Sequence, residues 1–253
     1  MSDLTAVRSL RRWNIGVGAA HAVQALVLLV LANDFAIPVV SKVADGPPGQ
    51  PITLERTFFD VRFSIAIAVF LLLAAVDHLL MASPRVIDWY EANLRRHVNY
   101  ARWIEYSVSA SIMVVLIAML FGIVDLYALI GLFAVNAAMI LFGLLMEQVN
   151  RPGERVNWWP FAFGCIVGIV PWVAIVIAMI SAEQEGDGVP GFVYGILVSL
   201  FLLFNCFALN QWLQYRGRGR FADYVYGERV YLVLSLVAKS ALAWQVYSGT
   251  LAD

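Results

Sequence analysis

Apolar residues dominate the chain in seven long stretches, and charged residues, glycines or prolines separate each stretch from the next. Each stretch is close to the roughly 20 residues that an α-helix needs to cross the hydrocarbon core of a bilayer. Charge and exposed backbone are unstable in hydrocarbon, so these separators end the spans. The pattern therefore predicts seven membrane-spanning helices, at residues 10–32, 60–82, 100–123, 126–147, 158–181, 189–214 and 228–249.

Two of the connections have a pattern of their own. Residues 36–42 and 52–58 are rich in β-branched residues, and Gly46-Pro47-Pro48-Gly49 lies between them. This arrangement predicts two short strands around a turn. An irregular loop is the alternative, because proline is a poor strand residue. Residues 84–99 place apolar side chains among arginines with the spacing of a short helix that lies in the membrane interface.

The overall composition agrees with a membrane protein that has little mass outside the bilayer. Hydrophobic residues make up 61% of the chain and charged residues 14%, and the mean hydropathy is +0.77. A net charge of −1 gives no indication of nucleic-acid binding. We expect an all-α membrane protein, a seven-transmembrane helical bundle that forms one domain over residues 1–253, with no cleaved signal peptide and no disulfide framework.

Basic residues are distributed unevenly between the two sides of the predicted membrane. The side of the N-terminus holds Arg8, Arg11, Arg12, Arg85, Arg95, Arg96, Arg102, Arg151, Arg155, Arg216, Arg218, Arg220 and Arg229. The other side holds only Lys42, Arg56 and Arg62. Cytoplasmic loops carry the excess of basic residues in most membrane proteins. The asymmetry therefore predicts a protein of the cell membrane with a cytoplasmic N-terminus, an extracellular C-terminus and an extracellular hairpin.

Lys239 lies in the middle of the last apolar stretch, roughly 15–20 Å from the start of its helix. An ammonium group at this depth is costly unless it has a partner, water or no proton. Snorkelling toward the interface is the alternative, but it operates from helix ends. A neutral lysine in an apolar pocket is the nucleophile that forms a Schiff base with an aldehyde. Lys239 is therefore the strongest candidate for a functional residue.

Glu105 lies about one turn inside the third stretch, with Arg102 at i−3 and Ser109 at i+4 on the same helical face. It is the only acid that the pattern places deep in the membrane, so we expect it to neutralise a cation formed on Lys239. Structural pairing of Glu105 with Arg102 is the alternative, and it leaves Lys239 unexplained. Ser235 precedes Lys239 by one turn, so it offers a hydroxyl at this centre and no second carboxylate.

His21 and His78 lie in the first two stretches, toward the predicted cytoplasmic side. Each can hold or receive a proton, although a hydrogen-bonded packing role is an equal alternative for either. Most of the other polar residues inside the spans also lie in the middle or in the cytoplasmic half. An ion path needs polar groups along its whole length. The apolar extracellular half therefore argues against transport.

Three motifs on this seven-span pattern resemble the heliorhodopsins, which are retinal proteins inserted with an inverted orientation relative to ordinary microbial rhodopsins. They are Arg-Trp-Ile-Glu-Tyr-Ser at 102–107, Phe-Ala-Leu-Asn-Gln-Trp-Leu-Gln-Tyr at 207–215 and Ser-Leu-Val-Ala-Lys-Ser at 235–240. The resemblance covers essentially the whole chain. It implies all-trans retinal bound to Lys239 as a protonated Schiff base, with Glu105 as the counterion and Ser235 beside the linkage.

The resemblance also implies further residue roles and a partner. His21 and His78 would lie in a polar cavity on the cytoplasmic side, together with Arg102. The first extracellular loop would contribute strands to a homodimer. Depth in the membrane, as much as any motif, predicts a chromophore pocket, and plain packing is the alternative for each of its residues. These residues are Ser109, Asn136, Met139, Gly143, Trp172 and Phe204.

Two positions favour light sensing over a light-driven pump or channel. The pumps among microbial rhodopsins, which the chain also resembles, usually carry a second acid where this chain has Ser235. Proton pumps tend to carry a donor carboxylate eleven residues after the counterion, where this chain has Leu116. We expect a photoreceptor that moves no ions, is not an enzyme, holds no metal and needs an external signalling partner. A small-molecule transporter that binds substrate between Lys239 and Glu105 is a further alternative, which inverted repeats or broken helices would favour.

Overall fold

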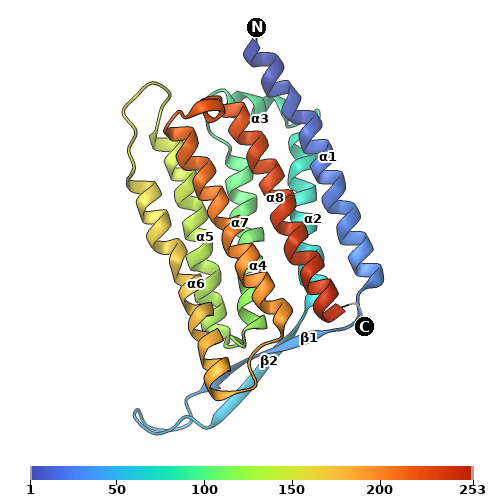
Figure 1. The fold of residues 1–253 in the computed structure, drawn as a ribbon, viewed down its shortest axis with the longest axis vertical. Coiled ribbons are helices and arrows are strands. Elements are labelled where there is room, and N and C mark those ends of the chain that lie inside the picture. The colour runs from blue at the N-terminus through green and yellow to red at the C-terminus, as the bar shows by residue number, and fades with distance from the viewer. Residues whose placement is uncertain (1, 252–253) are drawn as a thin grey trace.

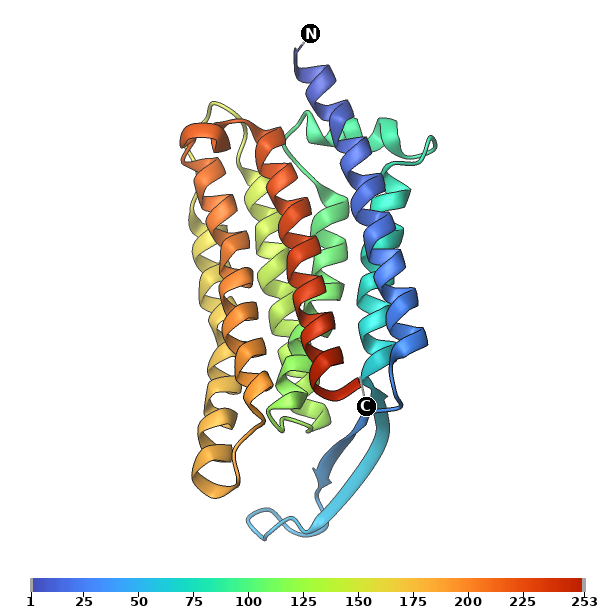
Figure 2. The same cartoon turned by 45° about the vertical axis from the view of Figure 1, so that its right-hand side comes forward.

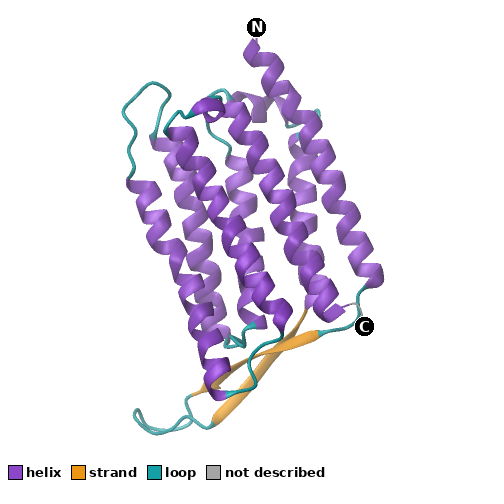
Figure 3. Ribbon diagram, viewed as in Figure 1, coloured by secondary structure: helices purple, strands orange, loops and turns teal. Residues whose placement is uncertain are grey.

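The structure is a computed structural model that describes residues 2–251, with side chains described from Arg8 onward. Long helices run side by side to form a bundle, and a two-stranded hairpin projects from one end of it (Figures 1 and 2). Apart from the hairpin, the described chain is almost entirely helical (Figure 3). Within the described residues, seven helices are long and apolar enough to cross a membrane, which confirms the predicted seven-helix bundle.

The spanning helices follow the predicted ranges closely. They are α1 (Ser2–Leu31), α2 (Phe63–Met81), α4 (Tyr100–Leu120), α5 (Leu126–Val149), α6 (Trp159–Glu185), α7 (Gly191–Tyr215) and α8 (Tyr224–Val246). Polar caps set three of their starts, because a side-chain oxygen accepts a hydrogen bond from a backbone N–H of the first turn. Asn99 caps α4, Asp125 caps α5 and Asp223 caps α8. Because Asp223 caps α8, this helix begins before residue 228, the predicted start of the last span.

The hairpin confirms the strands expected near residues 36–42 and 52–58. Strand β1 (Ala36–Val43) pairs antiparallel with β2 (Leu54–Arg62), with an irregularity in register between Val39 and Val40. The irregular-loop alternative is therefore wrong. Two hydrogen bonds fasten β1 to the connection between α4 and α5: Val40 N–H donates to the Val124 carbonyl at 3.0 Å, and Leu126 N–H donates to Ser41 Oγ at 3.0 Å.

The segment predicted as an interfacial helix forms α3 (Ile87–Leu94), which lies across the end of the bundle opposite the hairpin (Figure 2). Helix α1 packs against α2 and α8, and α4 packs against α2 and α5. Helix α6 packs against α5, and α7 against α8. A short 3₁₀ turn, η1 (Gly219–Ala222), joins α7 to α8, and α8 continues into a π-helical turn, η2 (Tyr247–Leu251). Tyr106 of α4 donates a hydrogen bond to the Tyr231 carbonyl of α8 at 3.0 Å, so the first half of α4 lies beside α8.

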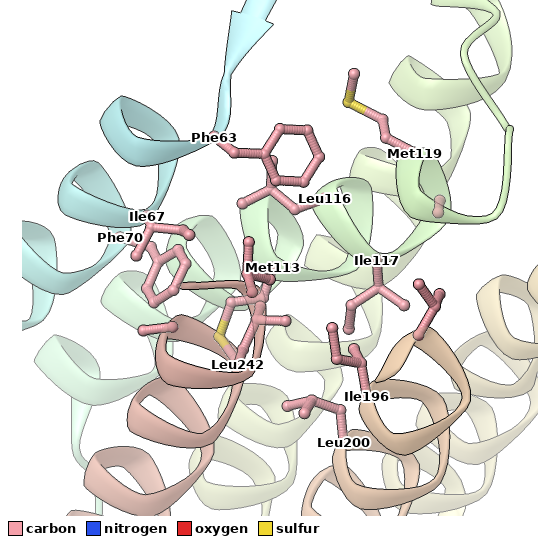
Figure 4. Packing of buried hydrophobic residues seen from close by; sticks show 14 of the residues in the cluster. Phe63, Ile67, Phe70, Met113, Leu116, Ile117, Met119, Ile196, Leu200 and Leu242 are labelled. Atoms are coloured by element: carbon pink, nitrogen blue, oxygen red, sulfur yellow. The ribbon is translucent and has the colours of Figure 1, made fainter. Parts of the chain in front are cut away.

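Apolar side chains fill the half of the bundle next to the hairpin. Figure 4 shows Phe63, Ile67 and Phe70 of α2 pointing toward a group from the other helices. This group includes Met113, Leu116, Ile117 and Met119 of α4, Ile196 and Leu200 of α7, and Leu242 of α8. The buried side chains of the opposite half are more polar and include Arg102, Glu147 and Glu228. The apolar half therefore separates the polar interior of the bundle from the hairpin end.

The core packing makes a testable prediction about stability. Ile117→Ala removes a side chain that is 0% exposed, so we expect a loss of about 2–5 kcal/mol from the lost contacts and the cavity that remains. Ile166→Ala is the matched control, because Ile166 is 66% exposed on α6 and packs against little within the chain. Unfolding of the purified protein in detergent measures both variants. An equal loss in the two would contradict the assigned core.

Candidate functional site

Lys239 and Glu105 meet inside the bundle although they are 134 residues apart in the chain. Lys239 Nζ lies 3.3 Å from Glu105 Oε2 and donates a hydrogen bond to Ser235 Oγ at 3.0 Å. The two charged residues are only 3% and 8% exposed. Each charge offsets part of the cost of burying the other. Lys239 therefore does not snorkel to a helix end, and it has the carboxylate partner that the sequence predicts.

Arg102 does not take part in this pair. Its guanidinium donates hydrogen bonds to the carboxylates of Glu147 on α5 and Glu228 on α8, both of which are buried. The alternative in which Glu105 pairs with Arg102 is therefore wrong. Glu105 is not the only buried acid, because Glu147 and Glu228, near the ends of their predicted spans, are 3% and 2% exposed.

A cavity of about 190 Å³ opens beside Lys239. Helices α4 to α8 surround it, and most of its lining is apolar or aromatic. Four predicted pocket residues lie on its wall: Met139, Gly143, Trp172 and Phe204. The wall also includes Lys239, Ser235, Trp103, Tyr106, Met113, Ile140, Phe161, Gly164, Gly168, Phe201 and Phe207. The reactive amine thus lies at the edge of an apolar pocket.

Two predicted pocket residues lie in the helix packing and not on the cavity wall. Asn136 Nδ2 donates to Ser111 Oγ at 3.0 Å, and both side chains are buried between α4 and α5. Ser109 is completely buried, and its hydroxyl has no hydrogen-bond partner among the described residues. Depth along a helix does not determine which face points to the cavity, so contact of these two residues with a chromophore stays a prediction.

Two glycines allow large side chains to form the wall. A Cβ at Gly143 would lie 2.3 Å from the Trp103 ring, and a Cβ at Gly168 would lie 2.4 Å from Met139 Sδ. Real Cβ atoms do not approach other atoms so closely, so any other residue would displace these side chains. Trp172 packs edge-on against Phe204, with ring centroids 5.5 Å apart. The sequence pointed to Gly143 and Trp172 but missed Trp103, which no spacing rule distinguishes from ordinary packing.

The two predicted histidines lie together. The rings of His21 and His78 stack with centroids 5.9 Å apart and planes 9° apart, and both residues are buried. Asn14 Nδ2 donates to the Leu10 carbonyl at 3.0 Å, so its amide oxygen faces His78 Nδ1 at 2.9 Å. This amide orientation requires a proton on Nδ1 of His78. Nε2 of neutral His78 is then a base, and it has no partner within the described chain.

A small second cavity, with room for about one water molecule, lies next to His78. Its wall also includes Asp77, Arg102 and Glu228, so the structure brings His78 and Arg102 together as the sequence predicts. His21 lies behind His78 and is not part of this wall. Within the part of the chain that the structure describes, no group of His, Cys, Asp and Glu residues could hold a metal ion.

The family model described as Heliorhodopsin matches residues 10–251. The chain belongs to the heliorhodopsin family. A search of curated proteins found no match to this heliorhodopsin.

Solved structures share its fold at low sequence identity. A light-driven proton pump from Leptosphaeria maculans is 15% identical, with a TM-score of 0.65 and 95% of each chain covered. Cyanorhodopsin from the cyanobacterium Tolypothrix is 14% identical, with a TM-score of 0.67 over 95% of this chain and 94% of the other. At these identities, the likeness concerns the fold alone.

Membership of the family makes the chain a multi-pass membrane protein of the retinal photoreceptor type. The cavity beside Lys239 fits such a chromophore. A long apolar aldehyde needs a primary amine at one end of an apolar pocket, and Lys239 supplies that amine. Glu105 Oε1 is buried and has no hydrogen-bond partner in the described chain, so one carboxylate oxygen is available to a further cationic or N–H group.

The close approach of Gly143 to Trp103 makes a prediction about retinal uptake. Gly143→Val should push the Trp103 ring into the cavity and reduce the retinal-dependent absorbance per protein at least several-fold. Gly131→Val on the same helix is the matched control, since nothing lies within 4 Å of a Cβ there. The measurement is visible absorbance after retinal is added to the purified retinal-free protein. Normal colour in Gly143→Val would show that the chromophore lies elsewhere.

Proposed function

We propose that this heliorhodopsin is a light sensor that carries all-trans retinal on Lys239 and moves no net charge across the membrane. The observation that carries this proposal is the buried pair of Lys239 and Glu105, 3.3 Å apart, at the edge of an apolar cavity. Bound to Lys239 as a protonated Schiff base, retinal supplies a cationic polyene that absorbs visible light and isomerises. The protein would hold this cation in place and receive its proton.

The residues around Lys239 have distinct roles in this proposal. Glu105 is the counterion, because it is the carboxylate that contacts Lys239. Ser235 lies one turn earlier on α8 and accepts a hydrogen bond from Nζ, so it orients the nitrogen without adding charge. The ring of Tyr106 lies 4.8 Å from Nζ, close enough for a favourable contact with a cation. Met139, Gly143, Trp172 and Phe204 enclose the apolar part of the pocket.

In this proposal, the histidines are the first acceptors of a proton that leaves the Lys239 centre. His78 has a free Nε2 next to the cavity shared with Arg102, and Asn14 holds its ring in the tautomer that keeps Nε2 basic. His21 stacks on His78 and confines its ring. Protonation of His78 would keep the proton in the half of the bundle opposite the hairpin. From there it can return to the Lys239 centre.

The half of the bundle near the hairpin supports the absence of transport. Transport requires that the Lys239 centre exchange ions with both sides of the membrane in turn. Between Lys239 and the hairpin end, the interior is filled by residues such as Met113, Leu116 and Leu242. A proton that entered this region would lose its hydration and meet mostly apolar side chains, with no buried carboxylate among the described residues of this half, at a large cost in free energy. Leu116 also takes the position at which a donor carboxylate would be needed.

We also propose the cell membrane as its location, with a cytoplasmic N-terminus and a homodimer formed through the hairpin. The distribution of arginines supports the orientation. The outer edge of β2 and the exposed ring of Phe59 support strand-to-strand contact with a second copy.

The proposed orientation can be tested in intact cells. A protease site added at the C-terminus should be cut, and one at the N-terminus should be protected.

The light signal of this heliorhodopsin would pass to an external partner protein, and the chain would have no enzymatic activity of its own.

The counterion role of Glu105 predicts a colour change when its charge is removed. Glu105→Gln should move the absorption band to longer wavelength, because the cationic ground state loses its stabilising anion. Spectra of the wild type and the variant at one neutral pH measure the effect, with Glu91→Gln on α3 as the control. An unchanged band in Glu105→Gln would assign the counterion to another group.

Illumination should produce no steady charge movement. Cells in unbuffered medium should show no light-induced pH change that a protonophore alters, and voltage-clamped membranes should show no sustained photocurrent. The reason is that apolar side chains fill most of the half of the bundle next to the hairpin, and its described residues include no buried carboxylate that could relay a proton. A sustained current that disappears in Lys239→Ala would contradict the sensor and establish a light-driven pump or channel.

A further inference from the structure

Arg102 is the centre of a buried ion cluster that retinal binding does not explain. Its guanidinium contacts one carboxylate on α5, that of Glu147, and another on α8, that of Glu228. The guanidinium also lies 3.7 Å from the centroid of the Tyr231 ring. Two carboxylates share one guanidinium, so the cluster carries a net charge of −1 when both acids are ionised.

Asn99 completes the cluster from the start of α4. Its backbone N–H donates to Glu147 Oε2 at 2.8 Å, and its side-chain amide donates to Glu228 Oε2 at 2.7 Å. These bonds hold both carboxylates in fixed positions. They do not cancel the extra negative charge, and an uncompensated charge in a protein interior is costly. One added proton, shared by the two carboxylates, would make the cluster neutral without breaking either contact to Arg102.

The cluster is connected to His78. Both border the small cavity described above, and a chain of polar groups runs beside it. Asn14, which binds His78 Nδ1, has its amide nitrogen 3.5 Å from Tyr90 Oη, and the amide nitrogen of Asn99 is also 3.5 Å from that oxygen. In the described part of the chain, three buried atoms around this cavity have no hydrogen-bond partner: His78 Nε2, Arg102 Nε and Tyr231 Oη. A water molecule in the cavity would satisfy such atoms and conduct a proton.

A larger cavity of about 290 Å³ lies on the other side of the cluster and borders Glu147. It opens among the connections at the end of the bundle that lies opposite the hairpin. The ionisable groups that face the cluster from both cavities and from the packed helices are Asp77, His78, Tyr90, His97, Tyr106, Arg151, Glu154, Tyr215, Tyr224 and Tyr231. The cluster therefore lies between the histidines and this end of the protein.

We infer that the Arg102–Glu147–Glu228 cluster is a proton-binding site that stores the proton released from the Lys239 centre in light. A proton on His78 Nε2 would pass through the cavity water to a carboxylate oxygen of Glu228 and be shared with Glu147, while Arg102 keeps its own charge. The transfer changes the net charge of the cluster from −1 to zero. The removal of this uncompensated buried charge favours the transfer. The origin of the proton rests on the proposed function, but the capacity of the cluster to bind one does not.

The retinal-free protein provides the first test. Infrared spectra across a pH series should show a buried carboxyl group that takes up a proton while the protein stays folded. Glu147→Gln and Glu228→Gln should each remove this signal, because each leaves one carboxylate for Arg102 and no excess charge to neutralise. Glu91→Gln, a buried acid of α3 that pairs with Arg95, is the control and should retain it. Retention of the signal in both cluster variants would overturn the inference.

Light-minus-dark infrared spectra of the retinal-loaded protein provide the second test. A carboxylic-acid band should appear as the Lys239 centre loses its proton, and both cluster variants should lack it. In both variants, the light-induced form in which the Lys239 centre has lost its proton should also decay several-fold faster, because the cluster no longer holds that proton. An unchanged band in both variants would refute proton storage by the cluster but leave the sensor proposal intact. A sustained photocurrent in the wild type would refute the sensor, whereas the retinal-free titration would still decide whether the cluster binds a proton.

Discussion

The burial of Lys239 against Glu105 is the interaction on which the rest of the structure depends. Neither charge is stable alone in the middle of a bilayer, so α8 and α4 must bring them together. Ser235 completes the coordination of the amine, and the apolar cavity begins directly beside it. Once the pair is in place, Trp172, Gly143 and most of their neighbours on the wall contribute the shape of the pocket and no charge.

The other buried charged residues lie on one side of that pair, and this asymmetry connects the fold with function. His78, Arg102 and Glu228 surround a small cavity in the half opposite the hairpin, whereas mostly apolar side chains fill the half that ends in the hairpin. A proton released at the centre therefore has buried charged partners in one direction only. Such an arrangement favours a protein whose Lys239 centre releases a proton and later takes up the same proton again. We therefore favour a light sensor over a light-driven pump.

Much of this organisation could be predicted from the sequence, because it depends on strong local signals. The seven apolar stretches, the paired strands and the i, i+4 relation of Ser235 to Lys239 all follow from spacing along the chain. The face of a helix that meets a cavity depends on tertiary packing, so depth alone does not distinguish Asn136, whose amide binds Ser111, from the residues on the cavity wall. Glu147 was missed for a related reason: it lies near a helix end, where a sequence pattern predicts exposure and only the packed neighbours reveal burial.

The most direct test of the account is to find where retinal is attached. The chain has two lysines, Lys42 on β1 and Lys239 on α8, so the protein contains its own control. Purified protein loaded with retinal is treated with borohydride, which converts the linkage to a stable amine, and the peptides are then mapped by mass spectrometry. The account predicts a retinyl group on the peptide with Lys239 and none on the peptide with Lys42. A label on Lys42, or a coloured Lys239→Ala variant, would contradict it.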